Sequence, residues 1–368
     1  MCGMTQEVVM KQQRAEKQKL SGTAETLRKK QQNSSVTIMS SNNSNSSSSG
    51  CSFREVDEPM KHVELAIYIP IFIVGMFFNL GALLVYCRCL RKWTESTIYM
   101  TSLALMDLLL LLPLPFKMHA AYHTWPQEFQ FACSFLENLY FVGTYGGIYM
   151  IMCIGVDRWL AICHPFKAKQ LRSPKAAVMT CMGIWVLVFT AIFPVTFNLR
   201  TVVKNDFHCF HRFSENGWSP KVIICLQIFG FLAPALTLVC CSAQVIWTLQ
   251  ESGQRSTTSQ ACVKIICSGL CCFLVPFTPS HLAIFLQFLV HQKVIVDCSS
   301  MKSISMFLQT TMCLSNITCC LDGLCYYFIA DEVKKNTKNN FRMSRLSLRR
   351  GNSSISELGS KTNRASSS

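Results

Sequence analysis

The chain alternates between long apolar stretches and short polar segments. Two of the apolar stretches, residues 96–116 and 303–330, are each interrupted by a single acid, Asp107 and Asp322. The other five contain no Asp, Glu, Lys or Arg, and they are residues 65–87, 138–156, 176–199, 222–250 and 265–292. A bilayer core about 30 Å thick needs roughly 20 apolar residues in a helix. The pattern therefore predicts an all-α membrane protein with seven transmembrane helices.

Composition and charge support this interpretation and give an orientation. Half of the residues are hydrophobic and 15% are charged, whereas soluble domains average about 25% charged residues. Cytoplasmic loops carry an excess of Lys and Arg, and residues 331–350 alone hold seven of them. The net charge of +15 is then mostly an orientation signal, and we expect no nucleic-acid partner. We predict an extracellular N-terminus, a helix bundle over residues 62–330 and a cytoplasmic tail at 331–368.

Residues 1–61 are expected to form a disordered extracellular segment. The run SSNNSNSSSSG at residues 40–50 cannot bury apolar surface. Three N-x-S sequons lie in this segment, and they require the extracytoplasmic side of the membrane. We expect glycosylation at Asn33, Asn42 and Asn45.

Of the 21 cysteines, those on the predicted outer side, where disulfides can form, include Cys51, Cys133, Cys209 and Cys298. Cys133 opens the third span and Cys209 lies in the second outer loop, so a bond between them would hold that loop across the mouth of the bundle. Cys51 precedes the first span and could reach Cys298, which lies between spans six and seven. We expect these two bonds, although spacing alone leaves other pairings open.

Polar residues and prolines inside the spans are the next candidates for function. An ionisable group in a membrane helix is costly unless it is paired or hydrated. We expect Asp107 and Asp322 to share a network of water or a cation, and the alternative is a local hydrogen bond for each. Pro234 and Pro279 lie within the fifth and sixth spans, where the missing amide hydrogen kinks a helix.

A set of short motifs, in their order and spacing, resembles the rhodopsin-like (class A) G-protein-coupled receptors over residues 60–341. The motifs are GMFFNLGALLVY around Asn79, SLALMDLLLLLPLPF around Asp107, DRW at 157–159, Trp185, FLAP ending at Pro234, PFTP at 276–279 and DGLCY at 322–326. The resemblance implies a plasma-membrane receptor, with no enzymatic activity and no cofactor, that couples agonist binding to a heterotrimeric G protein. It also implies a short amphipathic helix in the tail, and receptor kinases and arrestin as further partners.

The resemblance also assigns an activation path. It implies that Arg158 is held by its neighbour Asp157 in the resting receptor and released toward the G protein on activation. Asp107, Asp322 and Tyr326 are expected to take part in this change. The alternative for Arg158 is a snorkelling arginine that anchors the end of its helix.

Departures from the family pattern, together with one group of motifs, reduce the number of ligand classes that are expected. Tyr140 stands where amine receptors place an acid, and Asn316 replaces the lysine that binds retinal, so neither ligand is expected. The motifs LPLPFKM, ENLYFVGTYG, LRSPK, IWVLVFT, FLQFLV and CCLDGLCYYF resemble the branch that contains receptors for lysophosphatidylinositol and kynurenate. This resemblance implies an anionic lysophospholipid, with lysophosphatidylinositol as the expected species. The expected ligand-binding residues are Lys117, Glu137, Tyr140, Phe277, which replaces the family's usual tryptophan, His281 and Met312.

Several alternatives stay open at this point. Lys117 would meet the acidic head group, or it would form an ion pair with Glu137 that only fixes helices two and three. His281 would line the pocket or satisfy a hydrogen bond in the core. The ligand would otherwise be a nucleotide or a small aromatic acid. A transporter would show inverted repeats, which the sequence lacks, and an enzyme would need a cluster of catalytic groups around His281. The basic tail would lie against anionic lipid until phosphorylation releases it, or it would serve only as an orientation signal.

Overall fold

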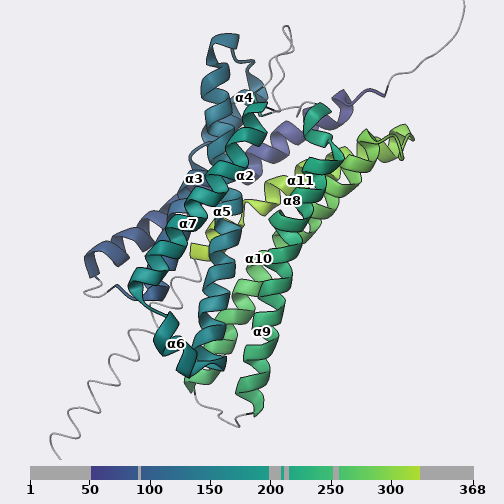
Figure 1. Ribbon diagram of the computed structural model, residues 1–368. Coiled ribbons are helices and arrows are strands. Elements are labelled where there is room, and N and C mark those ends of the chain that lie inside the picture. Colours follow the sequence, from purple (N-terminus) through teal and green to yellow (C-terminus); the bar gives the residue numbers. More distant parts are fainter. Residues whose placement is uncertain (1–50, 90–92, 199–208, 211–214, 252–256, 324–368) are drawn as a thin grey trace, which may run out of the picture. The chain divides into compact units, whose positions relative to one another are not determined.

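The computed structural model describes residues 51–89, 93–198, 209–210, 215–251 and 257–323, which are drawn as coloured ribbon in Figure 1. Every regular element among these residues is a helix. Seven helical segments are long and apolar enough to cross a membrane. The predicted all-α bundle with seven spans is therefore confirmed.

The seven spans follow one another with short connections. In chain order they are α2 (Arg54–Cys89); α3 (Glu95–Leu111) with α4 (Leu114–Tyr122); η1 (Gln127–Phe129) with α5 (Gln130–Cys163); α7 (Pro174–Asn198); α8 (Pro220–Gln227) with η3 (Ile228–Leu232) and α9 (Ala233–Glu251); α10 (Thr257–His291); and α11 (Cys298–Ser315), continued to Gly323. A short helix α6 (Pro165–Leu171) connects spans three and four, and a turn of 3-10 helix, η2 (Glu215–Trp218), precedes span five.

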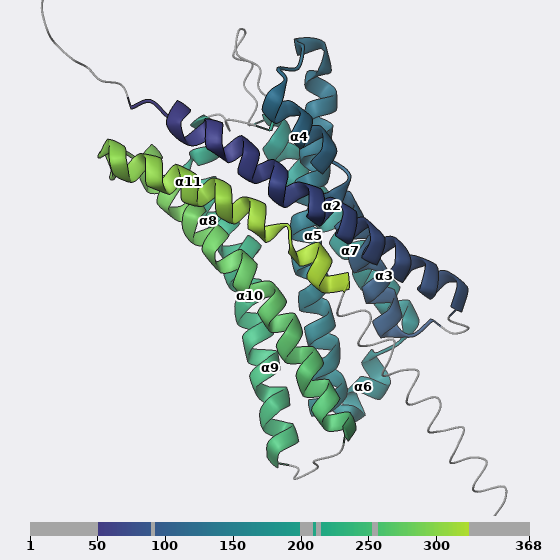
Figure 2. The same cartoon turned by 180° about the vertical axis from the view of Figure 1, so that it is seen from behind.

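Helix α5 is the centre of the bundle. It contacts α3, α7, α9 and α10 (Figure 1), and α6 lies at its C-terminal end. In the view from behind, α2 and α11 lie side by side (Figure 2), so that the first and last spans meet. This arrangement brings polar residues of α2, α4, α5 and α11 together at one end of the bundle.

Glycines allow α3 and α5 to approach each other closely. A Cβ atom added at Gly143 of α5 would lie 2.7 Å from the Met106 carbonyl oxygen and 2.8 Å from the Leu110 Cα, both in the backbone of α3. Small residues permit such contacts between membrane helices. The backbones of spans two and three therefore touch where a larger residue would keep them apart.

Prolines lie within the fifth and sixth spans, and in the fifth the helix departs from regular α geometry. Pro234 lies two residues after the π-helical turn η3. A proline clashes with the carbonyl four residues earlier, and a π-helical turn absorbs the misfit. In α10 the Ser280 hydroxyl, next to Pro279, lies 3.0 Å from the Pro276 carbonyl oxygen. The same hydroxyl lies 2.9 Å from the Thr311 carbonyl oxygen of α11. It can donate to either carbonyl, so it links the sixth span to the seventh.

Large apolar side chains cover the outward faces of the spans. Phe77, Met179 and Val275 are each more than 70% exposed. Soluble proteins rarely expose contiguous apolar patches of this kind, whereas a bilayer provides the apolar surroundings that these side chains need. The outward faces are therefore expected to contact lipid.

The bundle begins earlier than predicted, at Arg54 rather than residue 62. Residues 54–61, expected to be disordered, form the first turns of α2 and are held by the seventh span. Lys302 of α11 pairs with Glu55 at 2.6 Å, and Gln309 donates to Asp57 at 3.1 Å. The sequons at Asn33, Asn42 and Asn45, together with Tyr326 and the amphipathic helix expected in the tail, lie outside the described residues.

Candidate functional site

A lysine lies between two aromatic rings at the outer end of the bundle. The Nζ atom of Lys117, in α4, is 5.0 Å from the ring centroid of Tyr68 in α2 and 5.0 Å from that of Tyr140 in α5. A cation over a tyrosine ring is attracted by the negative face of the ring. The Lys117 side chain forms no hydrogen bond and no ion pair with any residue that the structure describes. Its charge is therefore held in place by the rings, without a direct ion pair to a carboxylate among these residues.

Glu137 does not pair with Lys117 but holds the second outer loop. Its Oε1 accepts a hydrogen bond from the Phe210 backbone N–H at 2.8 Å. Phe210 follows Cys209, which is disulfide-bonded to Cys133 one turn before Glu137, so the loop is attached at two points. The Lys117–Glu137 ion pair considered above is therefore not formed, and Glu137 acts on Lys117 only at longer range.

The outer cysteines give no metal site. Cys133, Glu137 and Cys209 lie close enough together to suggest one, but sulfurs joined in a disulfide are not the thiolates that bind metals. Cys51 and Cys298 are each disulfide-bonded as well. The bond between these two cysteines stays a prediction. Disulfides require an oxidising compartment, which agrees with this end of the bundle facing outward.

Three residues near Lys117 were not predicted from the sequence to belong to this site, and they are Tyr68, Cys313 and Glu64. Tyr68 is completely buried, and its hydroxyl accepts the Cys313 thiol of α11 at 3.2 Å. Glu64 lies four residues before Tyr68, hence on the same face of α2, and interacts electrostatically with Lys117. A tyrosine in an apolar span carries no sign of function. The sequence feature that could have indicated this site is Glu64, an acid one helical turn before Tyr68.

The other expected ligand residues do not contact Lys117 directly. The Nδ1 atom of His281 is 3.2 Å from Gln227 Oε1, and its ring stacks on Phe231 with centroids 4.8 Å apart. The geometry thus agrees with a histidine satisfied in the core. Phe277 is buried beside Phe273, with ring centroids 5.4 Å apart, and Met312 is partly buried in α11. Within the expected set, a direct contact joins Lys117 to Tyr140.

The two acids of spans two and seven line one small cavity at the centre of the bundle. Asp107 and Asp322 share it with Phe277 and Gly147, and its volume is about 10 Å³. This is close to the smallest space that holds a water molecule. The structure therefore brings the two acids to one place, and the water or cation network between them stays a prediction.

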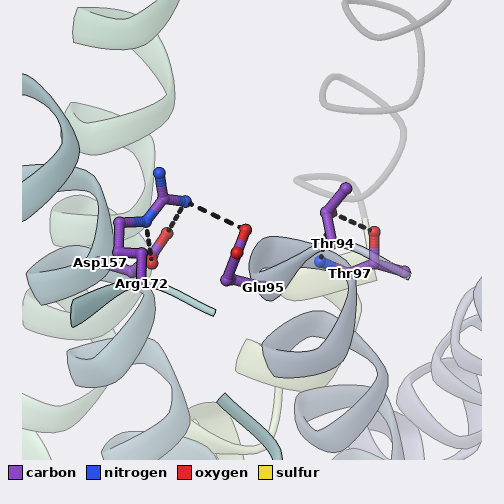
Figure 3. A network of polar contacts seen from close by, with 5 residues as sticks. All are labelled: Thr94, Glu95, Thr97, Asp157 and Arg172. Carbon is purple, nitrogen blue, oxygen red and sulfur yellow. Dashed lines mark hydrogen bonds and ion pairs between the residues drawn. The ribbon is translucent and has the colours of Figure 1, made fainter. Parts of the chain in front are cut away.

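The acid at the inner end of α5 has an unexpected partner. Asp157 pairs with Arg172, which connects α6 to α7: Arg172 Nε donates to Asp157 Oδ1 at 2.7 Å, and Nη2 donates to Oδ2 at 3.0 Å. Arg172 also lies 3.7 Å from Glu95 at the start of α3 (Figure 3). Burial lowers the pKa of Arg172, but the hydrogen bonds and charge of Asp157 raise it further, so its pKa lies above its usual value.

The pairing of Asp157 with Arg158, expected in the resting receptor, is not formed in this structure. Arg172 offers the two-point geometry that suits a carboxylate, and it binds both oxygens of Asp157. The Nε atom of Arg158 is buried without a hydrogen-bond partner. In the part of the chain that the structure describes, the Arg158 side chain forms no ion pair either.

Comparisons with known proteins agree with this architecture. The sequence model of the family described as "7 transmembrane receptor (rhodopsin family)" matches residues 78–339. Human "G-protein coupled receptor 55" is 41% identical over 305 residues, which cover 81% of this chain and 94% of that protein. Mouse "Lysophosphatidic acid receptor 4" is 31% identical over 76% of this chain and 78% of its own length. Mouse "G-protein coupled receptor 35" is 31% identical over 72% of this chain and 84% of its own length.

Proposed function

We propose, from the premise that the chain belongs to the rhodopsin family of seven-transmembrane receptors, that its agonist is an anionic lysophospholipid, and specifically lysophosphatidylinositol. Membership of this family makes the chain a multi-pass plasma-membrane receptor that couples to heterotrimeric G proteins, and not an enzyme. The observation that carries the ligand proposal is the Lys117 ammonium between the rings of Tyr68 and Tyr140.

A charge that is partly withdrawn from water is unfavourable unless another group compensates it. The two rings compensate the Lys117 charge in part, and its three N–H donors lack partners among the described residues. A phosphate diester would supply the missing negative charge and accept charge-assisted hydrogen bonds. The site therefore suits a ligand with one acidic group.

The surroundings of Lys117 favour a lipid as the carrier of that acidic group. Buried apolar residues of spans one, two and seven surround the two tyrosines, and they are Ile71, Leu110, Leu111, Leu114, Cys313, Cys319 and Cys320. An acyl chain can share these apolar surroundings, whereas a nucleotide would need more polar partners. Two relatives named as lysophosphatidic acid receptors, from mouse and human, point to the same class of ligand.

We further propose that Arg158 contacts the G protein. It lies at the inner end of α5, and its side chain has no partner among the residues that the structure describes. A free guanidinium can form several hydrogen bonds to backbone carbonyls or a carboxylate of a partner. Receptor kinases and arrestin are proposed to act on the serine-rich basic tail.

The ligand proposal is tested by agonist dose-response curves on Lys117 variants. Loss of a charge-assisted hydrogen bond costs about 1.5 to 3 kcal/mol, so Lys117→Ala should lower the potency of lysophosphatidylinositol roughly ten- to hundredfold. The weak potency of a phosphate-free monoacylglycerol with the same acyl chain should not change. Lys61→Ala, at an outer lysine that pairs with Glu58 of its own helix, is the matched control and should behave as the wild type.

Two further variants separate this role from a structural one. If Lys117 only stabilised the helices, Lys117→Ala would weaken the charged and the uncharged lipid alike and would reduce surface expression. Glu137→Gln, alone and combined with Lys117→Ala, tests whether such a loss arises because the Glu137 carboxylate no longer has the positive charge of Lys117 nearby. Rescue by the double variant, without selectivity for the charged lipid, would contradict the head-group assignment.

A further inference from the structure

Three spans meet at a single arginine on the inner side of the bundle. Arg172 reaches Asp157 of α5 with two hydrogen bonds of 2.7 and 3.0 Å and comes within 3.7 Å of Glu95 of α3 (Figure 3). The Asp157 side chain is 7% exposed and that of Arg172 is 25% exposed. This is a shielded, two-point ion pair, which is stronger than an ordinary pair on the surface.

The pair determines what the neighbouring arginine can do. Both carboxylate oxygens of Asp157 accept hydrogen bonds from Arg172, while the next residue, Arg158, has no ion-pair partner among the described residues. A buried carboxylate that loses its counter-charge is strongly unfavourable. Without Arg172, Asp157 would need another cation, and Arg158 is adjacent in the chain.

We infer that Arg172 is a positioning residue for signalling: by occupying Asp157, it prevents Asp157 from pairing with Arg158 and leaves Arg158 available to the G protein. The inference rests on the proposed role of Arg158. Glu95 supports the arrangement from the α3 side, at a longer distance. The rate of nucleotide exchange then depends on which arginine holds Asp157, and the loop between spans three and four sets that choice.

The test compares Arg172→Gln, Asp157→Asn and the double variant in full-length receptor purified with its heterotrimeric G protein. Nucleotide exchange is measured with and without lysophosphatidylinositol, and surface expression is measured in parallel. Arg172→Gln should lower exchange about three- to tenfold, between the effect of an exposed ion pair and that of a shielded charged hydrogen bond. Adding Asp157→Asn should restore exchange, because a neutral amide no longer attracts Arg158.

Two controls define what the loop charge and the geometry contribute. Lys175→Gln removes one positive charge from an exposed position three residues further on and should leave exchange at the wild-type rate. Arg172→Lys keeps the charge but loses the two-point geometry, so it should give an intermediate rate. Equal losses in Lys175→Gln and Arg172→Gln would mean that the loop charge alone matters, which would overturn the inference.

The outcome distinguishes this inference from the proposal on which it rests. If Arg158→Ala still supports full exchange, the proposed role of Arg158 is wrong and the inference is wrong with it. If Arg158→Ala is inactive but the double variant exchanges no faster than Arg172→Gln, the inference alone is wrong. In that case the Arg172–Asp157 pair is only a structural tie between spans.

Discussion

Gly143→Ala is expected to destabilise the receptor, although alanine favours helix by up to about 1 kcal/mol over glycine. The new methyl group would lie 2.7 Å from the Met106 carbonyl oxygen and 2.8 Å from the Leu110 Cα. Both atoms belong to the backbone of α3, so no side-chain rotation removes the contact. Overpacking of this kind typically costs about 1 to 3 kcal/mol.

The displacement should also reach the ligand site. Helix α3 is continued by α4, which carries Lys117, and Gly143 lies one turn from Tyr140. Moving α3 away from α5 therefore lengthens the distance between the Lys117 ammonium and the Tyr140 ring. We expect the potency of an acidic agonist to fall together with stability.

The assay is the melting temperature of purified receptor, measured at one scan rate for all variants. A loss of 1 kcal/mol lowers the melting temperature by about 2 to 4 °C in chains of 150 to 250 residues. Two alanine substitutions serve as matched controls. A methyl group at Gly183 would meet nothing within 4 Å, and the atoms nearest to one at Gly146 belong to the flexible Met106 side chain. Gly183→Ala should be neutral, Gly146→Ala intermediate and Gly143→Ala lowest. A Gly143→Ala receptor that melts at or above the wild-type temperature would refute the reasoning.

Four further predictions follow from the sites. Arg158→Ala should preserve surface expression and ligand binding but abolish agonist-stimulated nucleotide exchange. Cys209→Ser removes a bond worth roughly 2 to 4 kcal/mol, so flow cytometry should show reduced surface expression, and agonist affinity should fall. Tyr68→Leu removes a ring that attracts Lys117 and should lower agonist potency about two- to thirtyfold, whereas Tyr68→Phe keeps the ring and most of the potency. Deletion of residues 331–368 should abolish agonist-driven arrestin recruitment, and normal internalisation of the truncated receptor would contradict a role for the tail.

The seven spans were predictable because each depends on its own composition. A helix in a bilayer needs about 20 apolar residues whatever its neighbours are, and seven windows of the sequence, two of them interrupted by a single acid, supply them. The start of α2 was not predictable in the same way. Its first turns are held by Lys302 and Gln309 of the last span, and contacts across the whole chain leave no local signal.

Some residues of the candidate site were predictable, but the contacts between their side chains were not. Lys117 and Tyr140 were expected at the ligand site, and the structure places the ammonium 5.0 Å from the Tyr140 ring. Tyr68 was missed because an aromatic residue in an apolar span resembles any other core residue. The pairing of Asp157 with Arg172 was not predicted, because Arg172 lies 15 residues further along the chain, after a short helix whose direction the sequence does not specify. Which side chains pair depends on the direction that a connection such as α6 takes between two spans.

The central claim is tested most directly by nucleotide exchange with purified receptor in lipid nanodiscs and a heterotrimeric G protein. Three kinds of compound are compared at equal concentrations: lysophosphatidylinositol, a phosphate-free monoacylglycerol with the same acyl chain, and a panel of nucleotides and small aromatic acids. We predict that lysophosphatidylinositol accelerates exchange, that the monoacylglycerol does so only weakly, and that Lys117→Ala reduces the response to lysophosphatidylinositol toward that weak level. Acceleration by a nucleotide or an aromatic acid, with lysophosphatidylinositol inert, would contradict the account.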